Sequence, residues 1–140
     1  MILRRATPED VAALTACLAA AYAPYLHLDL PPVTEGVAED LALHDVWVAE
    51  RDGQVVGGIV AELGQTAHII NLAVHPDAGG HGIGRELIDH VVQAAKSAGH
   101  AKIHLATHAK MTATQAFYRK SGWTETGNDG RKVYFERQLT

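Results

Sequence analysis

The sequence predicts a single α/β domain with a mixed, mostly antiparallel sheet of about seven strands and helices on both faces. The chain length, the composition and the order of the predicted elements support this fold class. A chain of 140 residues buries about 68% of its unfolded surface, which is enough for one core. Apolar residues make up 47% of the chain and charged residues 20%, as is usual in globular proteins. We therefore expect residues 1–140 to form one domain.

The N-terminal third predicts one short strand and two helices. Residues 2–5 have the composition of a strand. The Thr-Pro pair at residues 7–8 is typical of a helix start, and apolar residues recur at helical spacing as far as Tyr22. The proline-rich segment 23–32 predicts a loop, which we expect to form a lid or a pocket wall. A second, weaker helical pattern covers residues 34–43.

Three consecutive strands are predicted in the middle of the chain. Residues 46–50 and 55–63 are β-rich runs, and the turn residues 51–54 between them indicate a hairpin. The glycine pair 57–58 marks a bulge or a close backbone approach. Residues 66–74 are almost all apolar, which predicts a strand covered on both faces.

The C-terminal half predicts a long helix, a strand, a short helix and a final hairpin. Residues 103–107 form the strand and residues 112–121 the short helix, while 123–126 and 132–139 form the hairpin. Hairpins that precede a strand-helix-strand order imply a mixed sheet. The long helix shows one apolar stripe, Ile83, Leu87, Ile88, Val91, Val92, Ala95 and Ala98.

The bulk properties argue against several classes of protein. A net charge of −4 argues against a nucleic-acid partner, and no apolar run reaches the roughly 18 residues of a membrane span. Cys17 is the single cysteine, so it forms no internal disulfide; we expect a cytoplasmic location and a packing role for it. The spacing of the nine histidines matches no zinc motif, so no metal is expected.

Residues 79–84 contain four glycines directly before the long helix. Glycines leave backbone N–H groups uncovered, and the positive end of the helix dipole lies at the same point, so this segment predicts a phosphate site. The dinucleotide motif GxGxxG does not fit, because Arg85 or Leu87 stands at its third glycine. The Walker motif does not fit either, since Arg85 and Glu86 replace its Lys and Ser/Thr.

Residues 72–84 instead resemble the acyl-coenzyme A motif of the GNAT N-acyltransferase superfamily, V-x-P-x-x-[RQ]-x-x-G-x-[GA]. Residues 111–123 resemble a second stretch of that family, N-x-x-A-x-x-x-Y-x-x-x-G-[FW]. Gly79 departs from the pattern, because it stands where the family usually has Arg or Gln. The resemblance implies splayed central strands and acetyl-CoA as acyl donor.

The resemblance also implies where the cofactor binds. The pantetheine arm is expected along the strand that ends at Val74, with backbone contacts from Leu72 and Val74, and the Val74 N–H is expected to meet the oxyanion. The amides from Gly79 onward are expected to hold the pyrophosphate, with His81 or Arg85 as the cation. The full expected set is Leu72, Ala73, Val74, Gly79, Gly80, His81, Gly82, Ile83, Gly84 and Arg85.

Acetyl transfer to an amine needs a neutral nucleophile, yet a lysine-like amine is only about 0.04% neutral at pH 7. By resemblance, Tyr118 protonates the thiolate leaving group, and Phe117 is expected to face the core and so turn Tyr118 toward the strand gap. The base is left open between Glu62, His68 and a chain of water molecules.

The predicted function is transfer of an acetyl group from acetyl-CoA to a primary amine of a small molecule or peptide. A non-catalytic acyl-CoA-binding or interaction module on the same fold is the alternative, and a homodimer is allowed. The acceptor pocket is expected between residues 25–32 and the turn 128–130. The nearby acids favour a cationic amine or form only a solvated face; they are Asp29, Glu35, Glu39 and Asp40.

Overall fold

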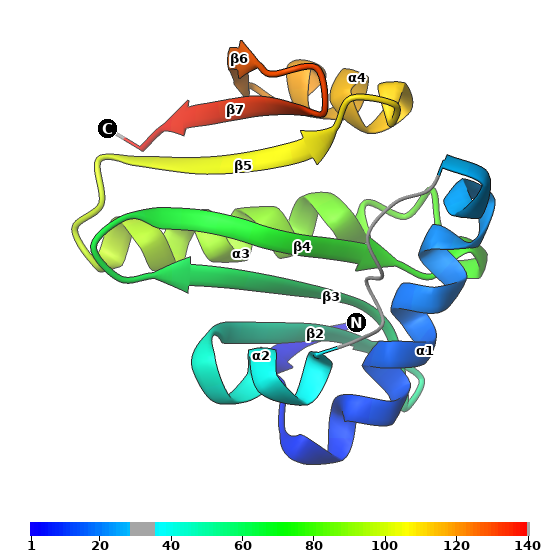
Figure 1. Ribbon diagram of the computed structural model, residues 1–140. Helices are drawn as coiled ribbons and strands as arrows, with labels where there is room; N and C mark the ends of the chain where they lie inside the picture. The colour runs from blue at the N-terminus through cyan, green and yellow to red at the C-terminus, as the bar shows by residue number, and fades with distance from the viewer. Residues whose placement is uncertain (29–35, 140) are drawn as a thin grey trace.

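In the computed structural model, which describes residues 1–28 and 36–139, seven strands form one sheet in the order β1-β2-β3-β4-β5-β7-β6 (Figure 1). Neighbouring strands are antiparallel except β4 and β5, which are parallel. This arrangement confirms the predicted mixed, mostly antiparallel sheet. The strands are β1 (Ile2–Arg5), β2 (Asp45–Arg51), β3 (Gln54–Leu63), β4 (Ala67–Val74), β5 (Lys102–His108), β6 (Thr124–Asn128) and β7 (Lys132–Gln138).

Helices cover both faces of the sheet. Figure 1 shows α1 (Val11–Tyr22) and α2 (Val37–Leu43) in front of it, and α3 (Ile83–Ser97) and α4 (Thr112–Lys120) behind it. The predicted stripe of α3 is buried from Ile83 to Ala95, but Ala98 is exposed because the helix has already ended there. Cys17 packs in the core as expected, at 1% exposure. In the described ranges no helix is long and apolar enough to cross a membrane.

The first helix and the segment after it differ in detail from the prediction. A short 3-10 helix, Pro8–Asp10, precedes α1, so the α-helical hydrogen bonding begins later than the Thr-Pro start. The predicted loop after Tyr22 begins instead as a 3-10 helix, Ala23–Leu28, which proline tolerates near its start. Residues 29–35, which carry the rest of that predicted loop, lie outside the described part of the chain.

Strand β4 contains a bulge that the sequence did not predict. Val60 of β3 lies opposite Asn71, but the next residue, Ala61, lies opposite Ile69, so Ile70 has no partner. Because side chains alternate along a strand, the extra residue reverses which positions face α3. Before the bulge Ile69 packs on the α3 side, whereas after it Leu72 does. The bulge thereby turns Asn71 to the side of α1.

The glycine pair in β3 serves both purposes that the sequence suggested. Val56 is an extra residue opposite the Ala49–Glu50 step of β2, so a bulge lies directly beside Gly57. At Gly58 the backbone approaches α1 so closely that an added Cβ would overlap the Cδ1 atom of Leu14. Leu14 is 2% exposed, so its side chain has little room to move.

Gly58→Ala is therefore expected to lower the free energy of unfolding by about 1–3 kcal/mol, as overpacking of a core does. Gly64→Ala is the matched control, because only Glu62 Oε1, at 4.0 Å, lies near its added Cβ. Urea unfolding of both variants measures the difference. Equal stability of the two variants would show that α1 shifts freely over β3.

Arg4 and Asp10 form a paired contact that ties β1 to the start of the first helix. Arg4 donates to the two carboxylate oxygens at 2.8 and 2.9 Å, and the Thr7 N–H donates to Oδ2 at 2.7 Å. These hydrogen bonds, the two from Arg4 above all, lower the pKa of Asp10 to about 2. The carboxylate is ionised in the folded state at pH values where the unfolded chain binds a proton.

The stabilisation by Asp10 is thus present above about pH 4 and is lost as the pH falls toward about 2. Asp10→Asn is expected to remove this pH dependence. At pH 7 it should also lower the free energy of unfolding by roughly 1–2 kcal/mol, since solvent partly screens the half-buried Arg4. Urea unfolding at several pH values between 2 and 7 measures both effects. If the stability of the variant kept the pH dependence of the wild type, other carboxylates would be responsible for that dependence.

Candidate functional site

The parallel strands β4 and β5 pair over two residues and then diverge (Figure 1). The pairs are His68 with His104 and Ile69 with Leu105. Beyond them, β4 continues to Val74 and β5 to His108. A cavity of about 690 Å³ lies at this opening, with both strands, the glycine run, α1 and α4 in its walls. Parallel strands that separate expose backbone groups on their facing edges, so the opening can hold an extended ligand.

The backbone of β4 offers Leu72 and Val74 to this opening. The His75 N–H donates to the Val56 carbonyl at 2.8 Å, which makes that antiparallel pair a hydrogen-bonded one. The next pair, Val74 with Gly57, is then non-hydrogen-bonded, and the backbone groups of Val74 point away from β3. The same alternation turns Leu72 outward and Ala73 inward. Because its backbone groups point toward β3, Ala73 lines the wall without offering a free backbone group, and the residue is only 3% exposed.

The glycine run presents a set of unpaired amides at the start of α3. In the described chain, the N–H groups of residues 80–85 have no backbone acceptor, and Gly80 and Gly82 adopt positive φ angles of 82° and 73°. The Gly79 N–H, however, donates to the Pro76 carbonyl at 3.2 Å. The Gly79 amide, which was expected to be free for the cofactor, is therefore already paired, because the 3-10 turn Pro76–Ala78 uses it. Six amides remain at the positive end of the helix dipole.

Side chains around the run differ in their access to the cavity. Gly79, Gly80, Gly82 and the residues 83–85 line it, whereas His81 is exposed and lies outside the lining. A Cβ at Gly84 would lie 3.5 Å from Val74 Cγ2 and 4.0 Å from Leu72 Cδ2, so Gly84 keeps the wall open beside β4. Of the two cations considered for the missing Arg or Gln, Arg85 reaches the cavity and His81 does not.

Tyr118, on α4, lines the cavity. It is 5% exposed and packs against Phe117, Trp123 and Phe135, with ring centroids 5.3–5.8 Å away. Its hydroxyl has no protein hydrogen-bond partner among the described residues. Burial raises the pKa of this phenol, so it stays protonated. Phe117 packs against the core as expected, but it is only partly buried and also lines the cavity, so Tyr118 is the more buried ring.

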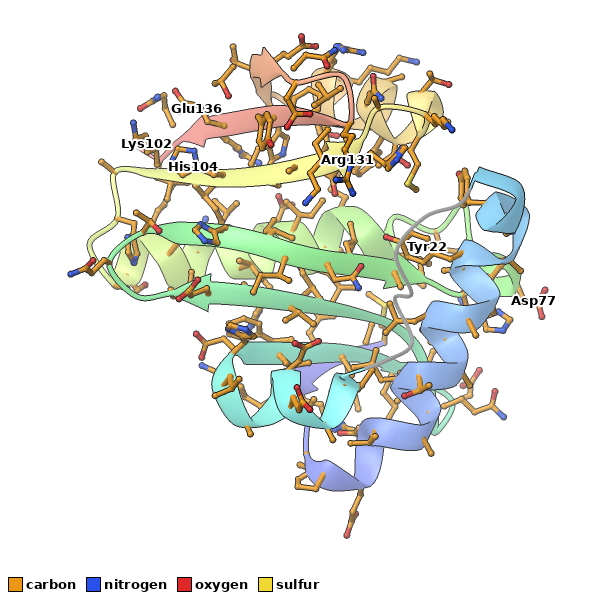
Figure 2. All side chains as sticks on the ribbon, in the orientation of Figure 1. Tyr22, Asp77, Lys102, His104, Arg131 and Glu136 are labelled. Carbon is orange, nitrogen blue, oxygen red and sulfur yellow. The ribbon has the colours of Figure 1, made fainter. Side chains whose placement is uncertain are left out.

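Tyr22 and Asn71 form a polar pair that the sequence did not predict. The Tyr22 hydroxyl donates to Asn71 Oδ1 at 3.2 Å, and both side chains line the cavity. Burial raises the pKa of Tyr22. Figure 2 shows Tyr22 directed from the end of α1 toward the end of β4. The signal that could have found it is the position of Tyr22 in the last turn of α1, next to a proline-rich segment.

Glu62 and His68, the two side chains considered as base, do lie together. His68 Nε2 is 3.3 Å from Glu62 Oε2 across β3 and β4. They are 48% and 40% exposed and are not part of the cavity lining. The same row continues to His104 and Glu136, 3.8 Å apart, and Figure 2 shows this pair at the opposite end of β5 from Tyr22. Within residues 1–28 and 36–139, the lining contains neither a carboxylate nor an imidazole.

Only one of the two expected walls of the acceptor pocket lies at the cavity. Tyr25 lines the cavity, but the turn 128–130 does not. Asp129 in that turn instead accepts hydrogen bonds from the N–H groups of Arg131 and Lys132 and from the Tyr134 hydroxyl. Asp29 and Glu35 lie outside the described residues. In the described ranges, no three His, Cys, Asp or Glu side chains converge as metal ligands.

Comparison with known sequences gives consistent matches. Residues 14–123 match the acetyltransferase (GNAT) family. N-acetyltransferase 8 of Rattus norvegicus is 28% identical over 109 residues, which is 73% of this chain and 49% of that protein. The IAA acetyltransferase of Azospirillum brasilense is 35% identical over 86 residues, 59% of this chain and 56% of that protein. The chain thus spans about half the length of these curated relatives.

Solved structures share the whole fold. A PaiA N-acetyltransferase from Thermoplasma acidophilum, solved in complex with coenzyme A, superimposes with a TM-score of 0.87 over 98% of each chain at 17% identity. The ribosomal-protein-S18-alanine N-acetyltransferase from Escherichia coli gives a TM-score of 0.82 over 99% of this chain and 94% of its own, at 19% identity. At these identities the likeness concerns the fold.

Proposed function

The chain belongs to the acetyltransferase (GNAT) family, and from this premise we propose that it transfers an acetyl group from acetyl-CoA to a primary amine of a small molecule or peptide. One observation carries the proposal. Five of the six residues with unpaired amides at the start of α3 (80 and 82–85) and the outward backbone groups of Leu72 and Val74 border the same cavity. An anion and an extended amide-containing arm, which are the two parts of a coenzyme A thioester, fit such a pair of features.

In this proposal the pyrophosphate lies on the amides of residues 80–85, with Arg85 as the cationic side chain. The backbone groups of Leu72 and Val74 bind the pantetheine amides, as an added strand would. The thioester then lies deeper in the opening, beside Tyr118. Gly79 lines the cavity without a side chain that would narrow it, but its amide does not bind the pyrophosphate because it already donates to the Pro76 carbonyl.

The reaction forms a bond between the amine nitrogen and the acetyl carbon and breaks the carbon–sulfur bond. The outward Val74 N–H stabilises the oxyanion of the tetrahedral intermediate. Tyr118 donates its hydroxyl proton to the departing sulfur. Burial raises the pKa of the Tyr118 phenol. It also disfavours a free thiolate in the cavity, so the proton affinities of the phenolate and of the departing thiolate rise together.

The amine must lose a proton, and the described lining provides no acidic or imidazole side chain to take it. We therefore assign the proton to water bound by Asn71, whose Oδ1 already accepts from Tyr22. Asn71 retains two amide hydrogens as donors. The Glu62–His68 pair is not part of the cavity lining, although the next residue of β4, Ile69, is. A proton that leaves the amine can therefore reach this pair only through water molecules.

Release of CoA thiol from acetyl-CoA, measured over a panel of amines, tests the proposal. The panel contains an amino acid, a peptide with a free N-terminus, an alkyl diamine and an aromatic amine, and mass spectrometry detects the acetylated product. We expect release that depends on at least one amine. Binding of acetyl-CoA without amine-dependent release would favour the binding-module function, and no binding at millimolar acetyl-CoA would contradict both.

A further inference from the structure

The cavity at the strand opening has two sides with different linings. The glycine run, Arg85 and Tyr118 border it on the side of α3 and α4, where the proposed function places acetyl-CoA. The other side faces α1 and the 3-10 helix that follows it (Figure 1). An acceptor amine must approach the thioester from the side that the donor leaves free. The side chains on the α1 side therefore determine which amines can react.

Strands β4 and β5 present apolar side chains to the α1 side of the cavity. Ile69 and Leu105 pack in the core cluster that includes α3, so side-chain alternation turns the next residues, Ile70 and Ala106, toward α1. Both Ile70 and Ala106 line the cavity, and Ile70 is 44% exposed. A ligand with an apolar group would remove this isoleucine surface from water, which is favourable.

Two tyrosine rings complete the α1 side. Tyr22 and Tyr25 pack edge to face, with their ring centroids 6.2 Å apart and an angle of 61° between the ring planes. Both rings line the cavity and are partly exposed. The Tyr22 hydroxyl already donates to Asn71, so this residue offers the ligand mainly its ring surface. Tyrosine rings supply a large contact area at a low cost in side-chain entropy, and they suit an aromatic or aliphatic group.

The described residues place no charged side chain on the α1 side of the cavity. Arg85, the one charged residue in the described lining, lies in the first turn of α3 and is assigned to the pyrophosphate. A carboxylate or a second ammonium group on the acceptor would lose water here without gaining an ionic partner, which is costly. Apolar surroundings also lower the pKa of a bound amine, because they disfavour its charged form. The wall thereby promotes the neutral nucleophile that acetyl transfer needs.

We propose that the acceptor is a monoamine with an uncharged aromatic or branched aliphatic body, which binds between the Tyr22–Tyr25 pair and Ile70. This inference rests on the proposed function and names its substrate class. The amine nitrogen lies beside Asn71 and the thioester, while the body of the acceptor covers Ile70 and Ala106. Alkyl diamines and amino acids are poor acceptors in this arrangement, because each keeps a second charge against the apolar wall.

Steady-state acetylation of three amines tests the inference. 2-Phenylethylamine carries the aromatic body alone, phenylalanine adds a carboxylate to it, and 1,4-diaminobutane replaces it with a second amine. The values of kcat/KM are compared per concentration of neutral amine, because the three amines differ in pKa. We expect the value for 2-phenylethylamine to exceed each of the others at least about tenfold, a usual discrimination by an apolar pocket. An equal or higher value for either of the others would overturn the inference.

Ile70→Asp introduces a carboxylate into this wall, at a position that is already 44% exposed. It should lower the preference for 2-phenylethylamine over 1,4-diaminobutane at least about tenfold, because the second ammonium gains an ionic partner. The KM for acetyl-CoA should change little. Ile2→Asp is the matched control, since Ile2 is 58% exposed on β1, outside the cavity lining, and this variant should keep the wild-type preference.

Tyr25→Ala removes one ring and should raise the KM for 2-phenylethylamine at least about tenfold, as loss of a buried aromatic contact implies. Tyr25→Phe keeps the ring and should keep the wild-type KM. Thermal unfolding of each variant checks that the fold is intact. An unchanged KM in folded Tyr25→Ala, or an unchanged preference in Ile70→Asp, would overturn the inference and leave the proposed function standing. Acetyl transfer to no amine at all would instead contradict the proposed function itself.

Discussion

Tyr118→Phe is expected to lower kcat for acetyl transfer by at least about 100-fold, the usual contribution of a positioned general acid. The variant keeps the ring packing against Trp123 and Phe135 and loses only the hydroxyl, so the KM for acetyl-CoA should change little. Because burial raises the pKa of Tyr118, the wild-type kcat should show no loss from this group below about pH 10. Steady-state release of CoA thiol against pH measures both effects.

Tyr134→Phe is the matched control for this variant. Its hydroxyl donates to Asp129 on an exposed turn, and its ring lies outside the cavity lining. This control should keep wild-type turnover. If Tyr118→Phe also kept it, with thermal stability equal to the wild type, the departing sulfur would take its proton from solvent and the role assigned to Tyr118 would be wrong.

Gly84→Leu is expected to separate binding from stability. The Cβ fits, at 3.5 Å from Val74 Cγ2, but the remaining leucine atoms extend into the cavity beside β4. The dissociation constant for acetyl-CoA should rise at least about tenfold. The free energy of unfolding should stay equal or rise by up to about 1 kcal/mol, because glycine is a poor helix former. Calorimetry and urea unfolding on the same preparation measure the two quantities.

Gly84→Ala provides the control, since its single added carbon fits the space and should leave binding near the wild-type value. A Gly84→Leu variant that bound acetyl-CoA normally would place the donor somewhere other than the wall between Gly84 and Val74. Loss of binding together with loss of stability would point to a packing role for Gly84.

The elements with a strong local pattern were predictable from the sequence. The stripe from Ile83 to Ala95 repeats at helical spacing, and all of its members are buried in α3. The glycine run at residues 79–84 predicted an anion site at a helix start, and the unpaired amides of residues 80–85 agree with that geometry. Both features depend on residues close in sequence, where spacing alone fixes the arrangement.

The features that were missed depend on contacts between distant segments. The bulge at Ile70 reverses the facing of β4, and no glycine or proline marks it. Tyr22 and Asn71 meet across 49 positions of the chain. The Glu62–His68 pair has the residue types of a base, but strand register places it outside the cavity lining. Gly79 loses its amide to a turn that Pro76 sets up, which a motif comparison does not reveal.

The most direct test of the acyl-CoA site is the amide NMR spectrum of the protein titrated with acetyl-CoA. We expect saturable shifts of the amides of residues 80–85, Leu72 and Val74, with the Gly79 amide affected less because it stays bonded to Pro76. The row that contains Glu62 and His104 should remain unperturbed. Saturable shifts at that row with none at residues 80–85 would contradict the proposed acyl-CoA site and place the ligand on a different part of the sheet.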